Sequence, residues 1–174
     1  MGDHKNMPPF QAHFTRDEVS IREELIIKYI VSFIKDSQQI NRITPYFLEY
    51  GIIDWAWPLR FVRGNEPYKG YRYYSQEARD AVLNGQIKFR RDHFFPKKQL
   101  KEMLFNMNSP DQNGVRQIME KHGEICVITI QEDARLSAAG FQRTMPQGWQ
   151  IENGSMFARY EAIGVNVWTN DRQW

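Results

Sequence analysis

The chain has 174 residues, of which 41% are hydrophobic and 25% charged, a composition typical of a globular protein that can bury a substantial core. Its formal net charge of only +2 does not demand a polyanionic partner, so any phosphate-binding surface has to be local. The single cysteine, Cys126, excludes an internal disulfide and a zinc site built from several cysteines.

The first half of the chain is predicted to be a flexible arm (1–14) followed by a mainly helical, aromatic-rich region (15–85). Thr15 and Glu18 have the spacing of a capping box, in which each side chain accepts a hydrogen bond from the other residue's amide. Apolar residues at helical spacing behind them predict an amphipathic helix that ends near Ser37. Its predicted inward face consists of Ile21, Leu25, Ile26, Tyr29, Ile30, Phe33 and Ile34.

The segment 43–74 is rich in aromatic residues, proline and glycine. Residues 54–58 alternate as a strand does. Tyrosines interleaved with cations over residues 68–74 are of the kind that stack on bases and contact phosphates. The alternative is an irregular segment that packs on the helices.

The second half (86–174) is predicted to mix short strands and helices. Residues 86–89 indicate a short strand, Pro96 a helix start, and the apolar, mostly β-branched run 125–130 a buried strand. Short helices over residues 132–139 and 156–163 and a strand over 165–168 follow. The predicted fold class is therefore α+β, with a helical N-terminal half, in one compact domain.

The stretch Asp92-His93-Phe94-Phe95-Pro96 carries the clearest chemical content. An adjacent carboxylate and imidazole can hold a divalent metal and a general base side by side. Asp92 is the one acid in a densely basic run, and such a combination indicates phosphodiester chemistry. The alternative is that Asp92 ends a surface strand and Pro96 simply begins a helix. The basic residues of the run are Lys88, Arg90, Arg91, Lys97, Lys98 and Lys101.

Together, residues 91–96 and the strand-to-helix run 125–136 resemble the core of the HNH, or ββα-metal, nucleases of bacteria and phages. In that family an Asp-His pair precedes a proline, a strand follows, and a helix supplies a further metal ligand. The resemblance implies a small ββα-metal-like core in the C-terminal half. Three features differ: the spacer from His93 to Thr129 is long, the family's middle Asn has no clear equivalent, and acids replace the usual helical His.

The resemblance implies a small metal-dependent endonuclease that cleaves DNA or RNA. His93 would be the general base, Asp92 a metal ligand, and Asp133 or Glu132 the ligand from the helix. The expected cofactor is a divalent metal, Mg²⁺ in the first place, because Mg²⁺ takes oxygen ligands and keeps several waters. The residues expected to position the nucleic acid are Arg90, Arg91, Lys97, Lys98, Arg135 and Arg143.

Two non-enzymatic alternatives stay open. A nucleic-acid-binding protein would combine the basic run 88–101 with residues 68–74 in one surface, and its binding would be sensitive to salt. A protein-binding module, such as an immunity, inhibitor or accessory protein of a bacterial or phage conflict system, would use exposed aromatic anchors. The anchors expected for that module are Trp55, Trp57, Tyr71, Tyr73 and Tyr74.

Nothing in the sequence indicates a membrane partner. No apolar stretch approaches the ~20 residues that a spanning helix needs. The polar residues 1–6 do not form the apolar centre of a signal peptide. We therefore expect a cytoplasmic protein.

Overall fold

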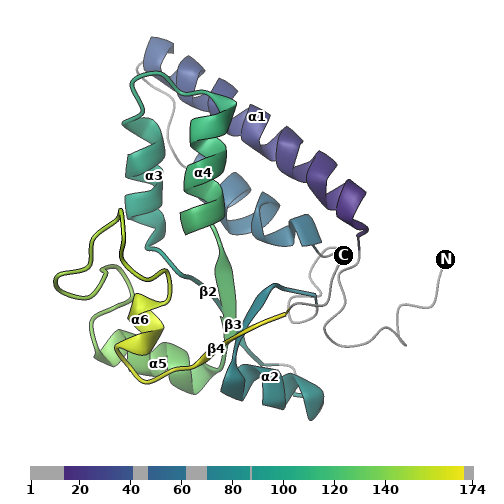
Figure 1. Cartoon of the computed structure of the whole chain (residues 1–174), viewed down its shortest axis with the longest axis vertical. Helices are drawn as coiled ribbons and strands as arrows, with labels where there is room; N and C mark the ends of the chain where they lie inside the picture. The colour runs from purple at the N-terminus through teal and green to yellow at the C-terminus, as the bar shows by residue number, and fades with distance from the viewer. Residues whose placement is uncertain (1–13, 41–46, 62–69, 87, 171–174) are drawn as a thin grey trace.

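The computed structural model describes residues 14–40, 47–61, 70–86 and 88–170 (Figure 1). Nearly all of the predicted arm and residues 68–69 of the predicted stacking run lie outside this part. The helices are α1 (Arg16–Ile40), the π-helix η2 (Phe47–Ala56), the 3-10 helix η3 (Pro58–Phe61), α2 (Gln76–Leu83), α3 (Lys97–Phe105), α4 (Gln112–His122), α5 (Ile130–Ala138) and α6 (Ala158–Glu161). The strands are β1 (Tyr73–Ser75), β2 (Arg90–His93), β3 (Ile125–Ile128) and β4 (Val167–Thr169).

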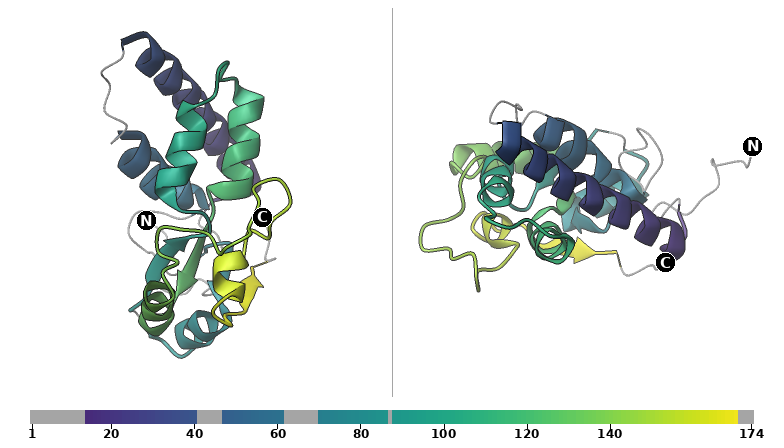
Figure 2. Two further views of the ribbon diagram at one scale, coloured as in Figure 1. Left: turned by 90° about the vertical axis from the view of Figure 1, so that its left-hand side faces the viewer. Right: turned by 90° about the horizontal axis from the view of Figure 1, so that it is seen from above.

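These elements form two parts that lie end to end (Figures 1 and 2). Helices α1, η2, α3 and α4 pack on one another at one end, and the small sheet with α2, α5 and α6 occupies the other. The predicted α+β class with a helical N-terminal half is confirmed. None of the described helices combines the length and the apolarity that a bilayer crossing requires.

Helix α1 begins with the predicted capping box. The Thr15 amide donates to the Glu18 carboxylate at 2.8 Å, and the Glu18 amide donates to the Thr15 hydroxyl at 3.3 Å. These two bonds satisfy amides that have no partner inside the helix. The helix continues past Ser37 to Ile40, beyond the predicted end.

The buried face of α1 is turned relative to the prediction. Ile21, Leu25 and Tyr29 are 61%, 49% and 65% exposed, respectively, so their predicted burial is wrong. The helix carries apolar residues on two neighbouring stripes, and α4, η2 and η3 pack against only one of them. The residues that this packing buries are Val19, Ile27, Ile30, Val31 and Ile34.

The strand predicted over residues 54–58 is absent from the described structure, because these residues complete η2 and enter η3. The Trp57 amide donates to the Ile52 carbonyl at 2.9 Å, five residues back, as π-helical geometry requires. Carbonyl groups near the end of a helix lack partners within it. The Ile53 carbonyl thus remains available to the imidazole of His93, which lies 3.3 Å away.

The sheet has the strand order β2-β3-β1-β4. Strand β3 is central, parallel to β1 and antiparallel to β2, and its side chains are buried on both faces. Ile125 and Val127 pack on the side of α2, while Cys126 and Ile128 pack with Leu136 of α5. This double burial explains the uniformly apolar sequence of β3.

The boundary predicted between residues 85 and 86 does not separate two packing units. Strand β1 comes from the first region and lies between β3 and β4, both from the second. Helices α3 and α4 come from the second region and pack on η2 and α1 of the first. The chain crosses between the two parts several times, so both regions contribute to each part.

Candidate functional site

An open pocket of about 460 Å³ lies where α3, β2, α5 and the loop after α5 meet. We call it the basic pocket. Four cations and two carboxylates contribute to its wall, together with one tyrosine, one glutamine and one proline. Its lining residues are Tyr50, Asp92, Pro96, Lys97, Lys98, Lys101, Asp133, Gln142 and Arg143.

Three of the cations come from the first turns of α3. Lys101 is four positions from Lys97 and three from Lys98, which makes it a neighbour of both at the same end of the helix. The residue before the helix, Pro96, offers no side-chain acceptor to the first-turn amides, and that turn contains no acid. The positive end of the helix dipole therefore adds to the charge of the three lysines.

Lys97 is held in place by two contacts. Its ammonium donates to the Asp54 carboxylate at 2.7 Å, and it lies 5.2 Å from the ring centroid of Tyr50. Both partners belong to η2, so these contacts connect the start of α3 to η2. Neither Tyr50 nor Asp54 was predicted as a site residue.

Asp92 forms part of the pocket wall and is anchored from α6. The Tyr160 hydroxyl donates to its carboxylate at 2.6 Å, and the Arg159 guanidinium lies 3.2 Å from the same oxygen. Burial raises the pKa of Asp92, Arg159 and the Tyr160 hydrogen bond oppose that rise, and the charge of Asp133 adds to it. The charge of Asp133 thus reaches the carboxyl group of Asp92.

Arg159 also connects the strand to the loop that carries the fourth cation. This buried guanidinium donates to the carbonyls of His93 and of Phe141, the latter at 2.6 Å. Gln142 and Arg143 directly follow Phe141 and line the pocket. Arg159 and Tyr160 were not predicted either, and no local sequence signal links them to Asp92.

The adjacent Asp92 and His93 point to opposite faces of β2. Asp92 pairs with Cys126 and shares its face, whereas His93 pairs with Ile125 and faces η2. His93 does not line the basic pocket. It lines a smaller pocket of about 230 Å³, which shares Asp92 and Lys97 with the basic pocket and therefore adjoins it.

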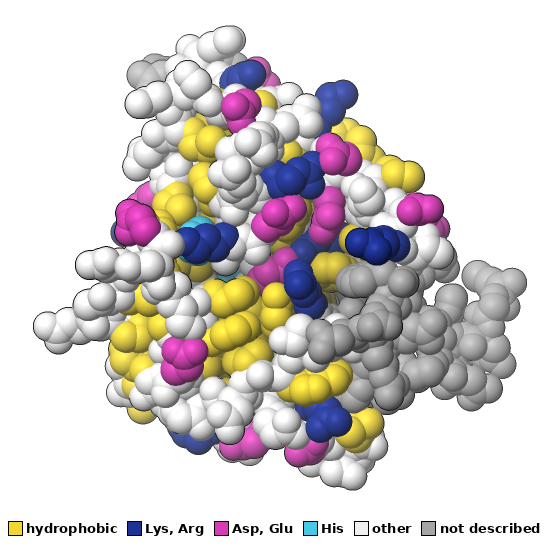
Figure 3. Space-filling model, in the orientation of Figure 1, with side chains coloured by type: hydrophobic (Ala, Val, Ile, Leu, Met, Phe, Trp, Pro, Cys, Tyr) yellow, Lys and Arg dark blue, Asp and Glu magenta, His cyan; other side chains and the backbone are white. Residues whose placement is uncertain are grey.

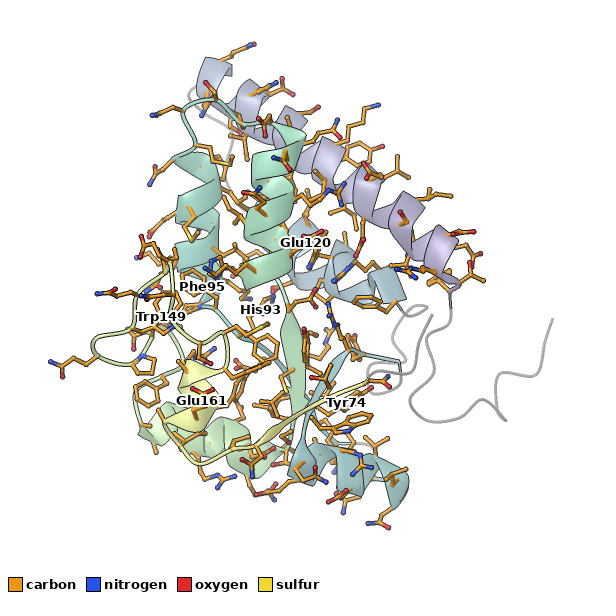
Figure 4. All side chains as sticks on the ribbon, in the orientation of Figure 1. Tyr74, His93, Phe95, Glu120, Trp149 and Glu161 are labelled. Atoms are coloured by element: carbon orange, nitrogen blue, oxygen red, sulfur yellow. The ribbon has the colours of Figure 1, made fainter. Side chains whose placement is uncertain are left out.

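His93 lies at the junction of the helical part and the sheet (Figure 4). Its Nε2 donates to the Ile53 carbonyl at 3.3 Å and is 3.6 Å from an Asp54 oxygen. A carbonyl can only accept, so Nε2 carries the proton and Nδ1 is the one basic nitrogen. Burial lowers the pKa of His93 to about 4, which leaves the ring neutral at pH 7.

Glu132 lies away from the basic pocket and has a structural role. It is buried and completes a capping box at the start of α5, where it accepts from the Thr129 amide at 2.7 Å. It also accepts from the Ser75 hydroxyl at 2.6 Å, which connects α5 to the start of α2. Of the two acids predicted as helical metal ligands, only Asp133 reaches the pocket.

Three of the predicted nucleic-acid contacts also lie outside the basic pocket. Arg135 pairs with Glu77 of α2 at 3.1 Å. Arg90 lies 3.6 Å from Asp133, and Arg91 lines the smaller pocket. The other three, Lys97, Lys98 and Arg143, line the basic pocket, which also has Lys101 in its wall.

The aromatic anchors expected for a protein-binding module are buried where the structure describes them. Trp57 belongs to the core of the helical part, and Tyr71, Tyr73 and Tyr74 are buried against the sheet. The side chain of Trp55 lies outside the described residues. Because β1 is an inner strand with both faces covered, its alternating tyrosines pack inward on either side.

Metal binding at the pocket would have to rely on two carboxylates. Among the residues that the structure describes, no cluster of three or more His, Cys, Asp or Glu side chains could hold a metal ion. Asp92 and Asp133 are the acids of the basic pocket, and Asp92 already faces Arg159. A cation there would share one of its two carboxylates with a guanidinium.

Strands β2 and β3 are antiparallel neighbours, and α5 follows β3 and contacts β2, but two helices, α3 and α4, separate the two strands in the chain. No family model matches the sequence, and no curated protein or solved structure gives a significant match. The similarity to HNH nucleases therefore stays a prediction. The function has to be argued from the pocket itself.

The structural role of Glu132 can be tested by substitution. Glu132→Ala removes the capping box and leaves the Ser75 hydroxyl without its acceptor, so we expect the free energy of unfolding to fall by about 2 kcal/mol. Urea unfolding followed by circular dichroism measures the change. Asp133→Asn, one residue along the same turn, is the matched control and should cost less than about 1 kcal/mol. Equal losses in both variants would contradict this assignment.

Stability should also depend on two buried imidazoles. Burial lowers the pKa of His93 and of His122 from 6.5 to about 4, and His122 packs against Phe95 and Trp149. Between pH 6.5 and about pH 4 the unfolded chain binds more protons than the folded chain. The free energy of unfolding is therefore highest above pH 6.5 and falls as the pH drops toward 4. Urea unfolding from pH 7.5 down to pH ~4.5 should show this loss. His93→Gln and His122→Gln should each flatten the dependence, and an unchanged profile in both would refute the assignment.

Proposed function

We propose that this protein binds the phosphate backbone of a nucleic acid, DNA or RNA, at the basic pocket. The observation that supports the proposal is the convergence of four cations on one open pocket in a chain whose net charge is only +2. On the face shown in Figure 3, acidic and basic side chains are interspersed, so this face has no extended positively charged surface. A local concentration of Lys and Arg is what phosphate contacts require.

The positive charges at the pocket are not all neutralised within the protein. Lys98 is 79% exposed on its side chain and lies 3.9 Å from Glu102, a contact of the weak, solvent-screened kind. The uncapped amides at the start of α3 add hydrogen-bond donors beside it. A phosphate at this position would meet ammonium groups and backbone donors together.

Binding at the pocket should depend on individual cations. Lys98→Gln, Lys101→Gln and Arg143→Gln each remove one phosphate contact, so each should weaken binding several-fold and lower the salt slope by about 0.7 to 0.9. Fluorescence anisotropy with labelled single-stranded DNA, duplex DNA and RNA at several salt concentrations measures both quantities.

The matched control for these variants is Lys28→Gln, which removes the same charge from an exposed position on α1. It should leave the affinity and the salt slope close to those of the wild type. If the pocket variants behave like this control, phosphate binding at the basic pocket is ruled out.

A second candidate function is metal-dependent cleavage of the bound phosphodiester. Its supporting observation is that Asp92 and Asp133 line the same pocket, where the charge of Asp133 helps to raise the pKa of Asp92. Mg²⁺, when bound, would supply charge neutralisation and an activated water. His93 is neutral at pH 7, but a pKa of about 4 makes it a weak general base, and only its Nδ1 has a lone pair for that role. The pairing of Asp92 with Arg159 weakens the metal site, so we place cleavage second.

For cleavage, we expect slow degradation of plasmid DNA or total RNA with Mg²⁺, and none with chelator. Asp133→Asn should abolish it without abolishing binding, because this variant loses a carboxylate but none of the four cations. Agarose gels over several hours provide the readout. Degradation that persists in Asp133→Asn or in chelator would exclude metal catalysis at this pocket.

A further inference from the structure

We infer that the basic pocket receives one unpaired nucleotide, whose base stacks on Tyr50, and that the protein therefore selects single-stranded nucleic acid over duplex. The inference rests on the proposed function and adds the substrate class. It follows from one exposed aromatic ring, the shape of the pocket and the polar groups inside it.

Tyr50 is the exposed aromatic residue at the site. Among the large hydrophobic side chains that are exposed in the described part of the chain, it is the one that lines the basic pocket, and it is 41% exposed. The Lys97 ammonium lies over its ring, 5.2 Å from the centroid, so a cation and an aromatic ring are paired at the pocket. Proteins that bind single strands use this pair, with the base stacked on the ring and the phosphate near the cation.

The shape of the site favours a flexible strand. The pocket is concave and measures about 460 Å³, which lies in the range that accommodates small organic ligands. A duplex presents its phosphates on a convex surface and keeps its bases stacked inside, so it can touch the cations but not fill the pocket. An unstacked nucleotide can place its base inside while its phosphate stays with the lysines.

The polar groups of the pocket can form hydrogen bonds with the edge of a base. Asp133 is partly exposed, and its contact with Arg90 at 3.6 Å is longer than a hydrogen bond, so its oxygens can accept from an amino group. Gln142 donates to the Ser137 hydroxyl, and its carbonyl oxygen can accept as well. Under the cleavage hypothesis Asp133 would bind a metal. Under this inference Asp133 recognises the base.

The test compares one sequence in two forms, as a 12-nucleotide single strand and as a blunt hairpin duplex, both in chelator. Wild type should bind single-stranded DNA or RNA at least about tenfold more tightly than the hairpin. Tyr50→Leu should lose about tenfold in single-strand affinity, because stacking on one aromatic residue contributes roughly that much, and should keep the wild-type salt slope. Tyr50→Trp should retain the affinity.

The control is Tyr29→Leu, which removes an exposed tyrosine on α1, away from the pocket, and should leave binding unchanged. If single strand and hairpin bind equally and Tyr50→Leu matches Tyr29→Leu, while the lysine variants still lose affinity, the inference falls and the proposed function stands. If neither polymer binds the wild type, both fall.

Discussion

The buried guanidinium of Arg159 is the interaction on which the candidate site depends. It lies against Asp92 at 3.2 Å and donates to the carbonyls of His93 and Phe141, so it joins β2 to the loop that carries Arg143. An isolated charge buried at this depth would be strongly destabilising, and the carboxylate and carbonyls offset that cost. A strand and a loop that have no regular hydrogen-bonded pairing with each other are thereby held on either side of one pocket.

The alternation of side chains along a strand decides what the Asp-His pair can do. Because β2 is a regular strand paired with β3, Asp92 and His93 face opposite sides of the sheet. Asp92 contributes to the basic pocket, while His93 donates to the end of η2 and connects the sheet to the helical part. Because they are adjacent on a strand, the two side chains point away from each other. They line a common wall only in the smaller pocket, which adjoins the basic pocket.

Charge at the pocket is concentrated by the geometry of a single helix. The uncapped start of α3 brings Lys97, Lys98 and Lys101 together with the positive end of the helix dipole. Tyr50 lies beside them because Lys97 contacts η2 through Asp54. In the function that we propose, phosphate binding and base stacking would share this one surface.

Local patterns in the sequence were sufficient for the capping box at Thr15 and the buried strand β3, because each depends on residues a few positions apart. They also placed three cations of the pocket in the basic run. They missed the burial of Glu132 and left open whether the tyrosines of β1 are exposed or packed, because both depend on neighbours distant in the chain. Only the tertiary structure brings Tyr50 and Arg159 to the site. Their contacts join residues that are far apart in the chain, and no pattern in a single sequence indicates such contacts.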